Sequence, residues 1–156
     1  MLPAMNDPIA IQRLAECPDA APAAALWLYA EWGHRYPGRT PDMAIALFRQ
    51  RANSDRMPMA WIASDGAVPV ATASLTAVET ADDEHGPWVG GVYVVPSHRG
   101  RGVALRLMAT LEAAAPGLGA RRLLLSAAAP ALYLRLGYRP TGAVKNGEPV
   151  MEKRLA

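Results

Sequence analysis

The sequence predicts one domain of the α/β class over residues 1–156, and three observations support this prediction. Apolar runs of strand length alternate with helical runs that carry capping signals, and turn residues separate them. A chain of 156 residues can bury roughly two thirds of its unfolded surface without disulfides. The chain has no internal repeat or linker-like segment, and its composition, 51% hydrophobic and 19% charged, is typical of a globular protein.

The first half of the chain predicts a strand, two helices and a hairpin. We expect these elements, in order, at 9–14, from Asp19 or Pro22 to Trp32, from Pro41 to about Ala52, and at 58–64 with 68–78. Gly33 would stop the first helix, while Thr40 and Pro41 are the capping and first-turn residues of the second. Asp65-Gly66 would form the hairpin turn. The second helix is expected to bury its larger apolar side chains, which are Met43, Leu47 and Phe48.

The second half predicts a loop, two buried strands that alternate with helices, and a terminal hairpin. These elements are expected at 79–86, 88–95, 103 to about 115, 121–126, 130–136, and 138–145 with 150–155. Paired glycines, Gly90-Gly91, interrupt the strand at 88–95 and indicate a β-bulge or a close backbone approach. The continuous apolar run at 121–126 is typical of a central parallel strand, and Asn146-Gly147 supplies the last hairpin turn.

A basic, glycine-containing turn joins the strand at 88–95 to the helix that follows it. Its residues are Arg99-Gly100-Arg101-Gly102. The first amides of a helix have no intrahelical acceptor, and the helix dipole is positive there, so such a turn is suited to bind an anion. Glycines allow the backbone to approach a phosphate closely and to adopt positive φ values. The sequence therefore predicts a phosphate-binding turn.

The spacing of its residues shows that this turn does not match two common phosphate-binding motifs. A P-loop requires Lys-Ser/Thr after its last glycine, but Val103-Ala104 follows Gly102. A dinucleotide-binding motif requires a small residue where Leu105 stands and an acidic residue about twenty positions later, where the chain has 123–125, all leucine. The first motif is excluded, and the second is poorly matched.

Two segments resemble a known family. Arg99-x-x-Gly102-x-Ala104, after an apolar strand and a proline, resembles the acyl-CoA signature of the GNAT N-acetyltransferase superfamily. Leu132 to Tyr138 resembles the Leu-Tyr-x-x-Leu-Gly-Phe/Tyr segment of the same superfamily. The resemblance covers roughly Pro58 to the C-terminus. It implies a mixed, mostly antiparallel sheet of about seven strands, with splayed parallel fourth and fifth strands and about four flanking helices.

The resemblance implies acetyl-CoA as cosubstrate and no metal. The turn would bind the pyrophosphate through its amides and arginines, and the strand before it would pair with pantetheine through backbone groups. Ser126 could replace an Asn that many relatives use to bond pantetheine. The expected cofactor-binding residues are Tyr93, Val94, Val95, Arg99, Gly100, Arg101, Gly102, Val103, Ala104, Ser126 and Tyr133.

Tyr133 matches the family tyrosine that protonates the departing thiolate, a role for which a phenol is suited. The general base is left open, because many relatives place a Glu on the strand before the turn and residues 88–93 contain none. Glu31 and Glu79 are the leading candidates; the others are His34, Glu84 and His85. For an amine acceptor we expect contacts from an aromatic wall and its loop, formed by Trp32, His34, Tyr36 and Trp88.

Several functional classes are disfavoured. A net charge of +2 does not indicate a nucleic-acid partner. The longest apolar run, Ala20 to Ala30, is too short to span a bilayer, and no signal-peptide pattern is present, so we expect a cytoplasmic protein. The single cysteine, Cys17, cannot form an internal disulfide. The alternatives to a small-molecule or peptide-amine acetyltransferase are a non-catalytic acyl-CoA-binding module and a protein N-terminal or lysine acetyltransferase, in each case as a monomer or homodimer.

Overall fold

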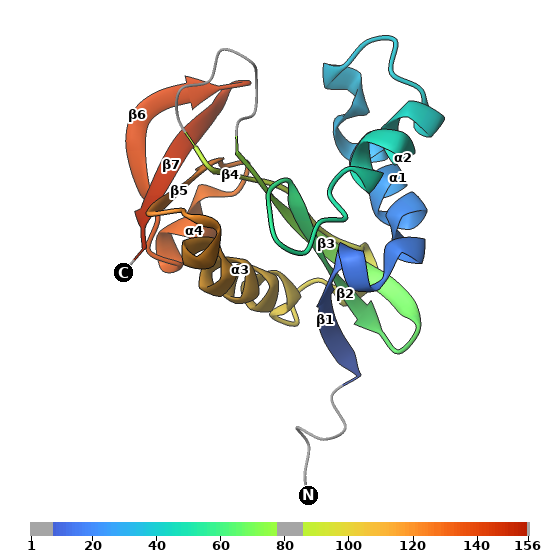
Figure 1. The fold of residues 1–156 in the computed structure, drawn as a ribbon. Coiled ribbons are helices and arrows are strands. Elements are labelled where there is room, and N and C mark those ends of the chain that lie inside the picture. The colour runs from blue at the N-terminus through green and yellow to red at the C-terminus, as the bar shows by residue number, and fades with distance from the viewer. Residues whose placement is uncertain (1–7, 78–85, 156) are drawn as a thin grey trace, which may run out of the picture.

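A computed structural model describes residues 8–77 and 86–155. Among these residues, seven strands form one sheet in the order β1-β2-β3-β4-β5-β7-β6 (Figure 1). The strands are β1 (Ile9–Arg13), β2 (Met59–Asp65), β3 (Val68–Thr76), β4 (Trp88–Val94), β5 (Arg122–Ser126), β6 (Arg139–Lys145) and β7 (Glu148–Arg154). The α-helices in the same ranges are α1 (Ala21–Trp32), α2 (Pro41–Arg49), α3 (Val103–Ala114) and α4 (Pro130–Arg135). The predicted mixed sheet and its order of elements are confirmed.

Strands β4 and β5 are parallel, whereas the other neighbouring strands pair antiparallel. The parallel pair meets only at Trp88 and Leu124, where the amide of Leu124 donates to the carbonyl of Pro87 at 3.0 Å. Beyond this point the two strands diverge, and the edge of β4 that faces β5 has no strand partner in the described ranges. The expected splay of the fourth and fifth strands is therefore present.

The helices cover opposite faces of the sheet (Figure 1). Helix α3 packs its buried residues, including Leu107 and Leu111, against the face that carries Leu123. Helices α1 and α2 pack on the other face, where Phe48 joins Ile62 in a second apolar cluster. Side chains alternate between faces along a strand, which explains why Leu124 lies opposite the α3 face.

Helix α2 begins as predicted, with the amide of Met43 donating to the Thr40 hydroxyl at 3.2 Å. The expected burial of Met43 and Leu47 is wrong, because these side chains are 49% and 41% exposed. The face of α2 that contacts the core instead carries Ile45 and the buried Phe48. A helix of two and a half turns buries only one narrow stripe, and the position of α1 decides which stripe it is.

The paired glycines of β4 form a β-bulge, as predicted. Ser74 pairs with Gly90 and Thr72 with Tyr93, so two residues of β4 lie opposite the single residue Ala73 of β3. Gly91 has a φ of +59°, which glycine adopts without strain. The bulge lies just past the point where β4 and β5 separate.

The C-terminal hairpin completes the sheet, because β7 inserts between β5 and β6. A polar network joins this hairpin to α3. The Tyr138 hydroxyl donates to Glu112 at 2.8 Å, and Lys153 pairs with the other carboxylate oxygen of Glu112 at 2.8 Å. Within residues 8–77 and 86–155, no helix has the length and apolar character needed to cross a membrane.

Candidate active site

The glycine turn connects β4 to α3 and has the local structure that the sequence predicts. Gly100 and Gly102 have φ values of +74° and +77°, and Gly102 is the N-cap residue of α3. The first intrahelical bond runs from Arg106 to Gly102, so the three amides before Arg106 have no acceptor within the helix. No atom lies within 4 Å of a Cβ built on either glycine. Backbone conformation, rather than crowding, requires glycine at these positions.

The basic residues of the turn are placed differently. The Nε of Arg99 donates to the carbonyl of Val94 at 2.9 Å, and its guanidinium lies 5.4 Å from the centroid of the Tyr93 ring. Arg101 is exposed. His98 anchors the turn to the hairpin of β2 and β3 through a 2.9 Å contact with Asp65. Arg99 therefore contacts the open edge of β4, while Arg101 extends from the turn.

Tyr133 lies on α4, which follows β5. Its ring packs edge to face on Tyr138, with centroids 5.9 Å apart. Burial, and then the negative charge of Glu148, raise the pKa of Tyr133, which keeps the phenol protonated at neutral pH. In contrast to Tyr138, its hydroxyl has no hydrogen-bond partner among the residues that the structure describes. A protonated, unbonded phenol is available as a proton donor.

Glu148 is a site residue that the sequence analysis missed. It begins β7, and the next residue, Pro149, accepts a 2.9 Å hydrogen bond from Ala127, immediately after β5. Glu148 therefore lies at the open end of the splay, close enough to Tyr133 to affect its ionisation. Its carboxylate pairs with Arg35 at 3.4 Å, and the two side chains are only 19% and 27% exposed. This ion pair joins the segment after α1 to the C-terminal hairpin.

The other residues considered as bases are distributed differently. Glu31 and His34 are exposed, on α1 and in the turn that follows it. Glu79, Glu84 and His85 lie outside the described residues. None of the β4 residues is a carboxylate. Ser126, the candidate for the pantetheine contact, ends β5 opposite Val150.

The expected aromatic wall is divided between two places. Trp32 packs edge-on against Tyr93, which stacks on Trp27 with centroids 5.8 Å apart. Tyr36 is 45% exposed and stacks under the Arg39 guanidinium at 4.0 Å. Trp88 lies elsewhere, buried with Leu124 and Val150.

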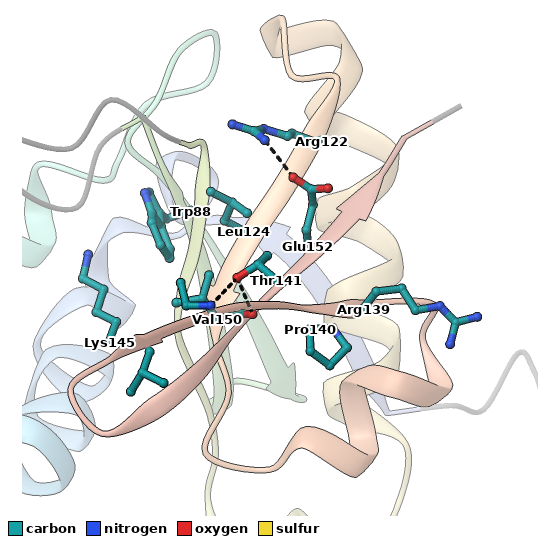
Figure 2. Close-up of a pocket in the computed structure, with 11 residues that line it drawn as sticks. Trp88, Arg122, Leu124, Arg139, Pro140, Thr141, Lys145, Val150 and Glu152 are labelled. Atoms are coloured by element: carbon teal, nitrogen blue, oxygen red, sulfur yellow. Dashed lines mark hydrogen bonds and ion pairs between the residues drawn. The ribbon is translucent and has the colours of Figure 1, made fainter.

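A pocket of about 670 Å³ opens beside Trp88, on the sheet face opposite α3 (Figure 2). Lys145 lies over the Trp88 ring at 4.3 Å. Figure 2 shows the ion pair of Arg122 and Glu152, 2.7 Å apart, on the opposite side of the pocket. The volume suits a small molecule. This pocket adjoins the paired end of β4 and β5, and no residue of the glycine turn lines it.

Comparisons with known proteins agree with this geometry. The model of the acetyltransferase (GNAT) family matches residues 22–138. Two structures of aminoglycoside 6'-acetyltransferase, one of type Ii and one complexed with coenzyme A, have TM-scores of 0.73 at 18% and 17% identity, and each match covers 94% of this chain and 97% of theirs. A GCN5-related N-acetyltransferase from Ralstonia eutropha is 25% identical, with a TM-score of 0.61 and coverage of 88% and 97%. A search of curated proteins finds no match.

Proposed function

The chain belongs to the GNAT acetyltransferase family, and we propose that it transfers an acetyl group from acetyl-CoA to an amine by direct attack in a ternary complex. The observation that carries this proposal is the single pairing point of β4 and β5. Past this point the backbone of β4 is open to an extended ligand, and the strand leads directly into the glycine turn. Tyr133, on the helix that follows β5, would meet the sulfur of such a ligand.

Binding of acetyl-CoA would use the turn and the open edge of β4. The pyrophosphate would sit on the free amides at the start of α3, with Arg99 and Arg101 supplying positive charge. Pantetheine would run along Tyr93, Val94 and Val95, near Ser126, and its amides would compete with Arg99 for the Val94 carbonyl. Arg99 would then turn from β4 towards the phosphates.

The reaction requires a neutral amine and a protonated thiol leaving group. An ammonium first loses a proton to a base, and the amine nitrogen attacks the thioester carbonyl. The carbon-sulfur bond of the tetrahedral intermediate breaks as Tyr133 protonates the sulfur. The nitrogen then gives one of its two protons to the Tyr133 oxygen, which restores the phenol. The products are the amide, free CoA and one proton, which the base releases to water.

We assign the base to Glu148, because its carboxylate lies at the open end of the splay near Tyr133. Its ion pair with Arg35 would hold the side chain in place until the acceptor ammonium arrives. Glu31 and Glu79 are the alternatives from sequence. The exposed position of Glu31 gives it less support, and Glu79 lies outside the described residues.

The first test measures thermal stability with and without acetyl-CoA, then thiol release with a panel of amines. Acetyl-CoA should raise the melting temperature, since a ligand that binds only the folded state stabilises it. The variant Arg99→Glu with Gly102→Asp should abolish this shift, because two carboxylates then face the pyrophosphate. Arg49→Glu is the control, since it reverses an exposed charge on α2 away from the turn. An undiminished shift in the double variant would refute the assignment of the turn.

A non-catalytic acyl-CoA-binding module is the second candidate, and the absence of a carboxylate from β4 favours it. For this candidate, acetyl-CoA would stabilise the protein but no amine of the panel would release free thiol. Acceptors on proteins would be detected in the same assay with lysine-containing and N-terminal peptides.

A further inference from the structure

Arg51 is a mostly buried cation, and none of the residues that the structure describes gives it a carboxylate partner. It follows α2, and its guanidinium lies 5.2 Å from the centroid of the Phe48 ring. One nitrogen donates to the hydroxyl of Ser74 at 3.0 Å, and this is the side-chain hydrogen bond that the guanidinium makes within the described ranges. No carboxylate in those ranges lies within 4.0 Å of it. An arginine has five N–H donors, so most of its donors are available to a ligand.

Aromatic and basic side chains surround Arg51. Burial lowers the pKa of its guanidinium, Tyr36 raises it, and the nearby positive charge of Arg39 lowers it. Arg39 itself stacks on Tyr36. Charged groups are seldom buried unless they are paired. A purely structural side chain at this position could be apolar, because Phe48 and its cluster lie beside it.

Arg51 lies beside the bulge of β4. A Cβ on Gly91 would come within 3.4 Å of an Arg51 nitrogen and 3.0 Å of Leu28, so glycine makes room for the guanidinium. Gly90 pairs with Ser74, and no atom lies within 4 Å of the position that its Cβ would occupy. Gly90 therefore leaves open space on the face of the sheet opposite α3, and Gly91 lets Arg51 approach the backbone beside it.

One residue of the pocket in Figure 2 lies close to this space along β4. Trp88 lines that pocket and precedes Gly90 by two residues, so the two positions point to the same face of β4. The open space at Gly90 also begins where β4 and β5 separate. The proposed function places the thioester at that point. The pocket and the Arg51 guanidinium thus lie on the same face of the sheet, with Gly90 between Trp88 and the residues beside Arg51.

We propose that Arg51 binds a carboxylate of the acceptor, so that the acceptor is an amino acid and not a simple amine or a protein lysine. The planar guanidinium can bind both carboxylate oxygens while Ser74 holds its remaining edge. The amine is thereby directed towards β4, and the side chain of the amino acid occupies the pocket beside Trp88. This inference rests on the proposed acetyltransferase function and specifies its substrate class.

The test compares matched acceptors with the unaltered protein. Each α-amino acid is assayed for thiol release beside its carboxamide and its decarboxylated amine. The best amino acid should have a kcat/KM roughly 10- to 100-fold higher than either partner, the range expected for a charge-assisted hydrogen bond. Equal or faster acetylation of the carboxamides and simple amines would overturn the inference while leaving the proposed function intact.

The variant Arg51→Met keeps most of the apolar stem and removes the charge. It should raise KM for the amino acid by a similar factor, with little change for the decarboxylated amine or for acetyl-CoA. Arg49→Met, on the exposed surface of α2, is the matched control. An equal loss with charged and uncharged acceptors would show that Arg51 acts only through folding, and the inference would fail. If acetyl-CoA does not stabilise the protein and no amine releases thiol, the proposed function fails and this inference fails with it.

Discussion

Tyr133 and Tyr138 are in ring contact, yet they occupy different kinds of environment. Tyr138 is fully buried, and its hydroxyl donates to Glu112, which also pairs with Lys153. Tyr133 lacks a hydrogen-bond partner among the described residues and faces the charge of Glu148. The network around Tyr138 satisfies its polar groups and joins α3 to the C-terminal hairpin. Polar groups at the splay are left with unused donors, as expected where a ligand supplies the missing partners.

The same contrast distinguishes the two sides of the splay. On the C-terminal side, Glu112 balances the charge of Lys153. On the side of α1 and α2, the described residues give the Arg51 guanidinium one side-chain hydrogen bond, to the neutral hydroxyl of Ser74. A cation that lacks a carboxylate partner can bind an anionic group of a ligand, which is the role proposed for Arg51.

The largest expected effect is a difference in kcat between variants of the two tyrosines. Tyr133→Phe should lower kcat by roughly 100- to 1000-fold, because it removes the proton donor of the leaving thiolate. The affinity for acetyl-CoA should change little. Tyr138→Phe is the matched control and should leave kcat within a few-fold of the unaltered protein. Thiol-release kinetics with isothermal binding of acetyl-CoA measure both quantities, and an unaltered rate in Tyr133→Phe would show that the thiolate leaves without this acid.

The next effect concerns Glu148 and its ion pair. Glu148→Gln should lower kcat by roughly 100-fold, less than the loss of Tyr133 can reach, since water can carry part of the proton transfer. Arg35→Gln breaks the same ion pair but keeps the carboxylate, so its kcat should fall by only a few-fold. Steady-state kinetics over a range of pH test this pair of variants. Equal losses in both would mean that Glu148 contributes only through the ion pair.

The smallest effect is on stability at alkaline pH. Burial, and then the hydrogen bond to Glu112, raise the pKa of Tyr138 above its ordinary value. The folded protein thus keeps the phenolic proton after the unfolded chain has lost it, so the stability that Tyr138 contributes is present below about pH 10 and is lost as pH rises above it. Above that pH, a tyrosine with a raised pKa in the folded state lowers the free energy of unfolding by about 1.4 kcal/mol per pH unit.

Urea unfolding between about pH 8 and 11 measures this loss, starting just below the ordinary tyrosine pKa of about 10. The free energy of unfolding of Tyr138→Phe should be lower by about 1–2 kcal/mol at neutral pH, because Glu112 loses a donor. The variant should then lose stability less steeply as the solution becomes alkaline. A slope equal to that of the unaltered protein would mean that Tyr138 ionises alike in the folded and unfolded chains.

Local signals in the sequence predicted most of the secondary structure. Thr40 and Pro41 marked the start of α2, Gly90-Gly91 marked the bulge, and Gly102 marked the start of α3. These features depend on backbone conformation and hydrogen bonds within a few residues, which residue type largely determines. The resemblance of the turn and of the segment around Tyr133 to one family extended the prediction to the splayed sheet.

Tertiary structure alone decided which distant residues meet. Nothing beside Glu148 in the sequence distinguishes it from a surface residue of a hairpin, and its position near Tyr133 follows from the insertion of β7 beside β5. Arg51 similarly resembles any basic residue after a helix, and only the tertiary fold brings it to Ser74 of β3. Local signals were enough to predict the strands, the helices and the turn, because these elements depend on conformation within a few residues. The pairing of charges across the splay depends on contacts between segments far apart in the chain, whose relative positions are set by packing of the whole sheet and its helices.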